Sequence, residues 1–375
     1  MRTKKLPERH NLILSLYFIR LSGMLGFSRN GSPDPVWNPG MPFSAGPVKN
    51  NKIVFLFLAL FLRYLYSKWF FMQDRSLWKA YLALAIVSVV WGTTYFALRI
   101  GVETFPPFLF SGVRQALAGA ILLVVLKLLG RLKFTGKDLL HQSVPGVLMI
   151  ALGNGVIGWS ERYIPSGLAA LIVSILPVYV VGVNYASGAD RRRPNVLIAS
   201  GLFLGCAGIV LMFRDNLKDI VRPEYLMGML VCFGACLAWA TGSVYAKQKP
   251  SSANVLTNAA LQMFSGGVVL LLMSLFLDDY SELQTVSAAS IWALVYLVVF
   301  GSILAYSSFV YALSRLPVGV ASLYAYINPF IALLMGYWWL SEELTWITIL
   351  ALLTALSGVY FINRGYKRYR KAIDN

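Results

Sequence analysis

Ten long apolar runs follow one another from residue 80 onward, separated by connections of often only a handful of residues. A helical span needs about 20 predominantly apolar residues, because the hydrocarbon core of a bilayer is about 30 Å thick. The pattern predicts an all-α membrane protein with ten transmembrane helices. The predicted spans are 80–98, 107–129, 143–160, 166–185, 195–213, 226–246, 257–277, 290–311, 318–339 and 345–363.

The composition is that of a chain dissolved in lipid. Of 375 residues, 58% are hydrophobic and 13% are charged, whereas soluble domains carry about 25% charged residues. A formal charge of +17 would suggest nucleic acid in a soluble protein. Here the basic residues fall in the gaps between apolar runs, where they set membrane topology. We therefore expect the lipid bilayer as a partner, and no nucleic acid.

The distribution of charge predicts the orientation. If the chain before the first span is inside, the basic clusters within 127–137, 191–193 and 364–371 all face the cytoplasm. Cytoplasmic loops carry an excess of Lys and Arg. We expect a multi-pass protein of the cell membrane with both termini cytoplasmic. The acids at the outer ends of spans are then Glu103, Glu161, Asp278, Asp279, Glu342 and Glu343.

Residues 1–75 differ from the rest. They contain the Gly-, Pro- and Asn-rich stretch 'SRNGSPDPVWNPGMPF' and two apolar stretches interrupted by Arg20 and Arg63. Such chemistry is typical of loops, and we interpret this part as a poorly ordered extension. A signal peptide or an eleventh span is the alternative.

The ten spans form two similar groups of five, predicted as repeats 76–214 and 222–366 with a basic cytoplasmic tail at 367–375. Because five is odd, the halves must cross the membrane in opposite senses. Such an inverted repeat lets one half rock against the other around a central site. The matches are Trp91 with Trp239, Pro165 with Pro317, Pro177 with Pro329, Gly208 with Gly358, and Arg214 with Arg364.

A family resemblance rests on three motifs, 'WGTTYFALRIGVETFPPFLFSGVRQALAGAILL', 'GNGVIGWSERYIPSGLAALIVSILP' and 'SLYAYINPFIALLMGYWWLSEELT'. Between about residues 76 and 364 the chain resembles the EamA-type branch of the drug/metabolite transporter superfamily. The resemblance implies ten helices, an inverted five-plus-five repeat and export of amino acids or related metabolites. The loop 'ASGADRRRP' departs from its twin 'LSEELT' by lacking the Glu.

Arg114 is the one charge predicted well inside a span. Intramembrane charges are costly and usually face a cavity, where an arginine suits a carboxylate. The alternative is a structural pair with Glu161, which is also the most accessible acid for proton linkage. The equivalent of Arg114 in the second half is Gln262.

Neutral polar groups are predicted at the same site. Asn154 lies between two glycines, and Asn328 precedes Pro329. Pro177 and Pro329 each free a carbonyl four residues earlier, either for a substrate contact or for a neighbouring hydroxyl at a simple kink. The candidate cavity walls are Trp91, Trp159, Trp239, Tyr306, Tyr324 and Tyr326.

Small residues repeat along one face of the fifth and tenth spans, at Gly201, Gly205 and Gly208 and at Ala351, Ala355 and Gly358. Such faces allow close helix packing, either within the monomer or in a homodimer.

Signs of catalysis are weak. The cysteines, Cys206, Cys232 and Cys236, lie in apolar runs and are interpreted as small fillers. 'GRLKFTGKDLL' differs from a phosphate-binding loop in spacing and has Asp138 where that loop has Ser or Thr. We expect no cofactor, no metal and no enzymatic activity.

The leading hypothesis is a secondary transporter that exports small organic metabolites such as amino acids. A membrane receptor, an assembly factor or an intramembrane enzyme is the rival.

Overall fold

The computed structural model describes residues 77–374, with gaps at 161–162, 165, 189–193, 215–216, 218–220, 250 and 332–344. All described residues fall within one compact unit, Pro47–Asn375. The extension predicted at 1–75 lies outside them, as do Glu161, Pro165, Glu342 and Glu343.

Each predicted span overlaps one or more helical segments in the described part of the chain, and residues 332–339 of the ninth span lie outside that part. The first half consists of α3 (Trp78–Val102), α4 (Pro107–Leu128), α5 (Gly136–Pro145), η1 (Gly146–Gly155), α6 (Val156–Ser160), α7 (Ser166–Ser174), α8 (Leu176–Ala186) and α9 (Val196–Met212).

The second half repeats this order after the short turn η3 (Pro223–Tyr225). Its elements are α10 (Leu226–Gln248), α11 (Val255–Leu277), η4 (Tyr280–Thr285), α12 (Ala288–Tyr296), η5 (Leu297–Leu304), α13 (Ala305–Arg315), α14 (Val318–Ala321), a helix over 324–331 and α16 (Trp346–Asp374). Within the described residues, six helical runs are long and apolar enough to cross a membrane, and four apolar helices are shorter. The chain is thus an all-helical membrane protein.

Several helices begin where side chains accept hydrogen bonds from free backbone N–H groups, as favoured helix starts do. Asn195 and Asn254 accept from the amides of Ile198 and Thr257 at 3.0 and 2.9 Å. At the other end of α11, the Asp278 carboxylate accepts from the first amides of α4, at 2.7 Å for Leu109. A carboxylate is favourable at a helix N-terminus, so Asp278 joins α11 to α4.

The third helix of each half contains a π-helical segment, which the sequence pattern does not predict. These segments, η1 and η5, continue α5 and α12 without a turn. A π-helix widens the backbone ring and often marks a functional site. Their recurrence in equivalent places supports the pairing of the halves.

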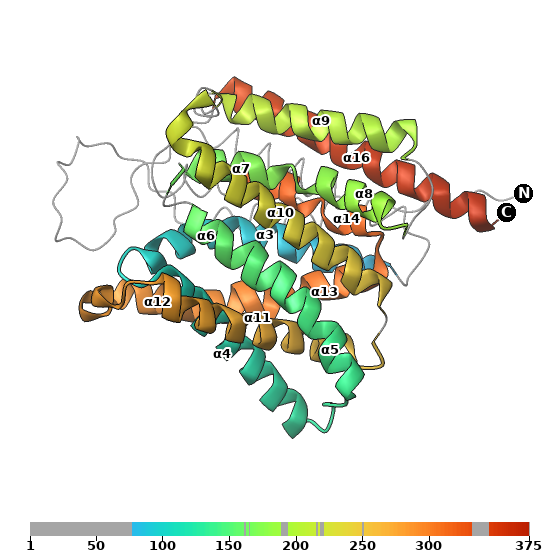
Figure 1. Cartoon of the computed structure of the whole chain (residues 1–375). Helices are drawn as coiled ribbons and strands as arrows, with labels where there is room; N and C mark the ends of the chain where they lie inside the picture. The colour runs from blue at the N-terminus through green and yellow to red at the C-terminus, as the bar shows by residue number, and fades with distance from the viewer. Residues whose placement is uncertain are drawn as a thin grey trace, which may run out of the picture. The chain divides into compact units, whose positions relative to one another are not determined.

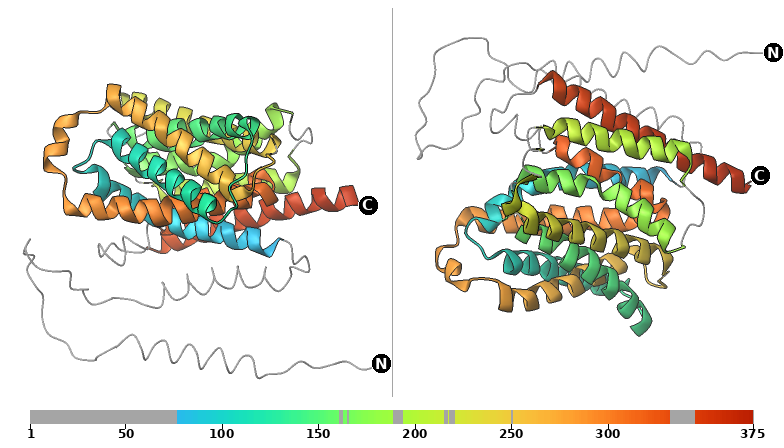
Figure 2. Two further views of the ribbon diagram at one scale, coloured as in Figure 1. Left: turned by 90° about the horizontal axis from the view of Figure 1, so that it is seen from below. Right: turned by 45° about the horizontal axis from the view of Figure 1, so that its top comes forward.

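The two halves pack crosswise: η1 contacts α10 and α11, and η5 contacts α3 and α4. Equivalent helices also pair directly, α4 with α11 and α9 with α16, as Figure 1 and Figure 2 show. In the first pair, a Cβ at Gly112 would lie 2.9 Å from the Leu271 amide nitrogen, and one at Gly119 would lie 2.5 Å from that of Phe264. Residue numbers rise along one helix and fall along the other, so α4 and α11 are antiparallel.

The glycine faces of α9 and α16 meet in the same way. A Cβ at Gly208 would lie 2.6 Å from the Ala351 oxygen, and one at Gly201 would lie 2.7 Å from the Gly358 oxygen. These helices are therefore antiparallel too. The face predicted either for packing or for a homodimer is occupied within one chain, so it is not free to form a dimer contact.

The fourth and ninth spans are both interrupted, but the two breaks lie at different distances from the equivalent prolines Pro177 and Pro329. α7 ends at Ser174 and α8 begins at Leu176, so the first break lies two residues before Pro177. In the second half the turn lies at Ser322 and Leu323. Pro329 is inside the helix that follows this turn, so the second break does not coincide with it.

Candidate functional site

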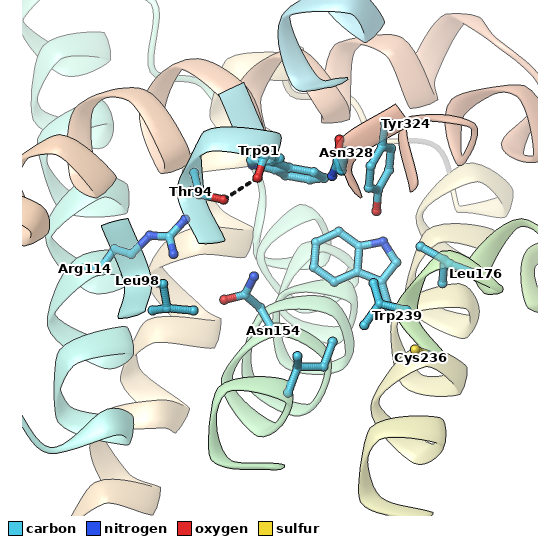
Figure 3. Close-up of a pocket in the computed structure, with 12 residues that line it drawn as sticks. Trp91, Thr94, Leu98, Arg114, Asn154, Leu176, Cys236, Trp239, Tyr324 and Asn328 are labelled. Atoms are coloured by element: carbon cyan, nitrogen blue, oxygen red, sulfur yellow. Dashed lines mark hydrogen bonds between the residues drawn. The ribbon is translucent and has the colours of Figure 1, made fainter. Parts of the chain in front are cut away.

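An open cavity lies where the two halves meet, with about 710 Å³ of empty space including its mouth. Both halves contribute to its wall, as Figure 3 shows. The lining residues are Trp91, Thr94 and Leu98 on α3, Arg114 on α4, Asn154 on η1, Ile157 on α6, Val173 and Leu176 on α7 and α8, Cys236 and Trp239 on α10, and Tyr324 and Asn328.

Arg114 is the charged group of this wall. Its side chain is 3% exposed, and its Nε donates to the Ser302 hydroxyl of η5 at 2.9 Å. Gly301 leaves room for the guanidinium, since a Cβ there would lie 2.9 Å from one terminal nitrogen of Arg114. Within the described residues no carboxylate forms an ion pair with Arg114. The terminal nitrogens therefore remain available to a ligand in the cavity.

An aromatic cluster forms the opposite part of the wall. Trp91 meets Tyr324 edge to face with ring centroids 4.8 Å apart, and Trp239 at 5.6 Å. Phe309 packs behind them, 5.4 Å from Trp91. Edge-to-face pairs are the preferred geometry of aromatic rings. The cluster gives the cavity rigid apolar surfaces.

The two indole nitrogens of this cluster differ. Trp91 Nε1 donates to the Gly301 carbonyl of η5 at 3.0 Å. Trp239 Nε1 is buried and donates to no acceptor among the residues that the structure describes. A buried donor without a partner is destabilising, so an acceptor on a ligand that reached this N–H would remove that cost.

The two predicted asparagines also line the cavity, with different surroundings. Asn328 is buried and, with its amide oriented to suit its neighbours, donates to the carbonyls of Ser88 and Tyr324 at 3.0 Å each. Its amide thus ties α3 to the helix over 324–331. Asn154 is half-buried on η1, and a Cβ at the neighbouring Gly153 would lie 2.9 Å from the Trp239 ring. Glycine here lets α10 approach.

Several predicted site residues lie elsewhere. Tyr306 and Gln262 form a buried chain behind the aromatic cluster: the Tyr306 hydroxyl donates to Gln262 Oε1 at 2.8 Å, and Gln262 Nε2 donates to Gln142 Oε1 at 2.6 Å. Tyr326 packs against Gly205 of α9. Trp159 packs against Tyr163 in a tilted arrangement, with ring centroids 4.7 Å apart. None of these side chains is among the lining residues, and Glu161 lies outside the described part of the chain.

Other lining residues were not singled out from the sequence. Thr94 and Leu98 follow Trp91 at intervals of three and four, and Cys236 precedes Trp239 by three. Residues at such spacing share one helix face, so extending that face from each tryptophan would have found them. Ser302 carries no comparable signal, because its role depends on how η5 packs against α4.

No metal centre is visible in the described ranges, where no group of three or more His, Cys, Asp and Glu side chains is placed to hold an ion. A duplicated bundle of apolar helices around a cavity with a buried arginine defines a polytopic membrane transporter. The EamA-like transporter family model matches residues 78–214 and 226–364, and the chain belongs to that family. It is therefore a transporter of the cell or inner membrane, not an enzyme, and the bilayer and a small-molecule substrate are its partners.

Relatives match along most of their length. The uncharacterized inner membrane transporter YedA of Escherichia coli (strain K12) is 32% identical over 295 residues, which cover 78% of this chain and 94% of that protein. The uncharacterized transporter YoaV of Bacillus subtilis (strain 168) is 25% identical over 284 residues, 75% and 96% of the two chains. A solved crystal structure superposes with a TM-score of 0.65 at 17% identity, over 77% of this chain and 98% of the other, and shares the fold.

Proposed function

We propose that the protein is a secondary transporter that exports small organic metabolites bearing a carboxylate, the class to which amino acids belong. The substrate binds between the halves 76–214 and 222–366. Arg114 carries this proposal, because it is buried at the cavity, its partner Ser302 is neutral, and no described carboxylate pairs with it. A buried charge without a partner is strongly unfavourable, and a substrate carboxylate would remove that penalty.

Alternating access is the proposed mechanism. The halves form an inverted repeat, which the antiparallel crossings of α4 with α11 and of α9 with α16 support. Two halves with one fold can exchange conformations, so a state open to one side implies a state open to the other. The N-terminus and C-terminus are both cytoplasmic in this proposal, since the basic residues then lie inside.

Within the site, each wall has its own part. Arg114 holds the anionic group, and the aromatic cluster packs the apolar body and excludes water. Asn154 offers a neutral amide, while Trp91 and Asn328 keep the wall in shape through their bonds to Gly301 and Ser88. Binding energy released by closing the cavity around the substrate drives the exchange between states.

Reconstitution tests this proposal. Purified protein in liposomes is preloaded with one unlabelled solute and supplied with trace labelled solute outside, across a panel of amino acids and organic acids. We expect labelled solute to accumulate by exchange, without ATP, for at least one carboxylate-bearing compound. If no panel member exchanges while the protein binds a solute tightly, the protein is a receptor and the transport proposal fails.

A further inference from the structure

We infer that the preferred substrate is a net anion, a monocarboxylate with an apolar body and a neutral oxygen acceptor at its far end, and not a zwitterion. This inference rests on the proposed function and narrows the class of substrate at the same site. Two groups carry it: the guanidinium of Arg114 and the unpartnered indole N–H of Trp239.

The first step concerns charge. Among the described lining residues Arg114 is the one charged side chain, and none is acidic. A bound monocarboxylate makes the cavity neutral overall. A zwitterion would pair its carboxylate with Arg114 but leave the cavity with a net positive charge on its ammonium, and no carboxylate among the described lining residues faces that ammonium. Uncompensated charge away from water is unfavourable, so the anion is the better fit.

The second step concerns the far end. Trp239 is 7% exposed and lines the cavity, and within the described part of the chain its Nε1 donates to no acceptor. Figure 3 shows Arg114 on one side of the cavity and Trp239 on the other, with Asn154 between them. An acceptor that reaches Trp239 Nε1 must therefore be remote from the carboxylate.

The third step concerns the kind of acceptor. A second carboxylate would give the occupied cavity a net negative charge, because Arg114 is the single arginine among the described lining residues. A ketone, ether or hydroxyl oxygen satisfies the indole N–H and leaves the cavity neutral. Between the two polar ends, the rings of Trp91, Trp239 and Tyr324 favour an apolar or aromatic body.

Three probes of nearly equal size separate these features. 3-(4-Hydroxyphenyl)propionate has the carboxylate and the remote oxygen, 3-phenylpropionate lacks the oxygen, and tyrosine adds an ammonium. Calorimetry on the full-length protein in lipid nanodiscs gives the three affinities. We expect the hydroxyphenyl acid to bind at least tenfold more tightly than tyrosine and severalfold more tightly than 3-phenylpropionate.

Variants assign each preference to its residue. Trp239→Phe keeps an aromatic ring, although a smaller one, and removes the N–H, so it should abolish the preference for the remote oxygen and retain the preference for the acid over tyrosine. Arg114→Gln should bring the acid and its uncharged primary amide to similar affinities. Trp292→Phe, at an exposed tryptophan on α12, is the control and should change neither ratio.

Tyrosine binding as tightly as the hydroxyphenyl acid would overturn the inference, as would the absence of binding by every acid. In either case exchange of any amino acid by the liposomes would leave the proposed function standing. If Glu161→Gln abolished the binding of tyrosine alone, that acid would be the partner of an ammonium and the inference would fail. The transport proposal itself fails only if no solute is exchanged.

Discussion

Trp91 and Trp239, which occupy equivalent positions in the two halves, meet edge to face with ring centroids 5.6 Å apart and an interplanar angle of 81°. Their N–H groups are used differently: that of Trp91 donates to the Gly301 carbonyl, and that of Trp239 has no acceptor in the ranges that the structure describes. The duplicated tryptophan has thus become a structural residue in one half and a candidate binding residue in the other.

Replacing each tryptophan by phenylalanine should separate these roles. Trp91→Phe leaves the buried Gly301 carbonyl without its donor and should lower stability by about 1–3 kcal/mol. Both variants replace an indole by a smaller ring and lose packing, but Trp239→Phe removes a donor with no acceptor among the described residues, so it should lose less stability than Trp91→Phe. Thermal unfolding in detergent measures both, and an equal loss of stability in the two variants would contradict this division.

Gly301 should control the position of Arg114. A Cβ in Gly301→Ala would lie 2.9 Å from a terminal nitrogen of Arg114 and 3.1 Å from the Thr94 methyl group. Because an arginine end can move, the variant should fold, but its affinity for a carboxylate should fall severalfold. Gly234→Ala, where an added Cβ meets nothing within 4 Å, is the matched control. Unchanged carboxylate affinity in Gly301→Ala would show that the guanidinium position is not critical.

The contact between α9 and α16 should be intolerant of even one methyl group. In Gly208→Ala the new Cβ would lie 2.6 Å from two backbone atoms, the Ala351 oxygen and the Ala355 nitrogen. Backbone cannot move as a side chain can, and overpacking typically costs about 1–3 kcal/mol. We expect a lower melting temperature for Gly208→Ala than for the open-space control Gly234→Ala. Equal melting temperatures would mean that the two helices separate easily.

Asp138 should hold together two loops from different halves. Its Oδ1 accepts from the Ser252 amide at 2.9 Å, and its Oδ2 accepts from the Thr135 amide at 2.9 Å. In Asp138→Asn one of these N–H groups must face an NH2 group, so the melting temperature should fall. Glu224→Gln removes an acid from an exposed ion pair of 3.9 Å with Arg222, and such surface pairs contribute little. A variant at Asp138 as stable as this control would show that the loops are held by other contacts.

The sequence predicts the helices well because the length of an apolar run is set by the bilayer and not by tertiary contacts. It also places Trp91, Arg114, Asn154, Trp239 and Asn328 at one cavity, since a charge, an amide or a repeated tryptophan inside an apolar run is conspicuous. It could not show that Tyr306 and Tyr326 point elsewhere, because a tyrosine mid-span suits either a cavity or a helix contact. The π-helical segments have no signal in the composition. The hydrogen bond between Arg114 and Ser302 of η5 could therefore not be predicted from the sequence.

The central claim is that Arg114 binds the carboxylate of a transported solute. Its most direct test compares the exchange of a labelled monocarboxylate in liposomes by the wild-type protein and by the Arg114→Gln variant. Glutamine is chosen because it already occupies the equivalent position in the second half, Gln262. A hydrogen bond to a charged group contributes about 1.5–3 kcal/mol, so we predict exchange at limiting solute to fall roughly 10- to 100-fold, with a neutral solute affected less. Wild-type exchange of the carboxylate by folded Arg114→Gln protein would contradict the claim and leave Arg114 a structural residue.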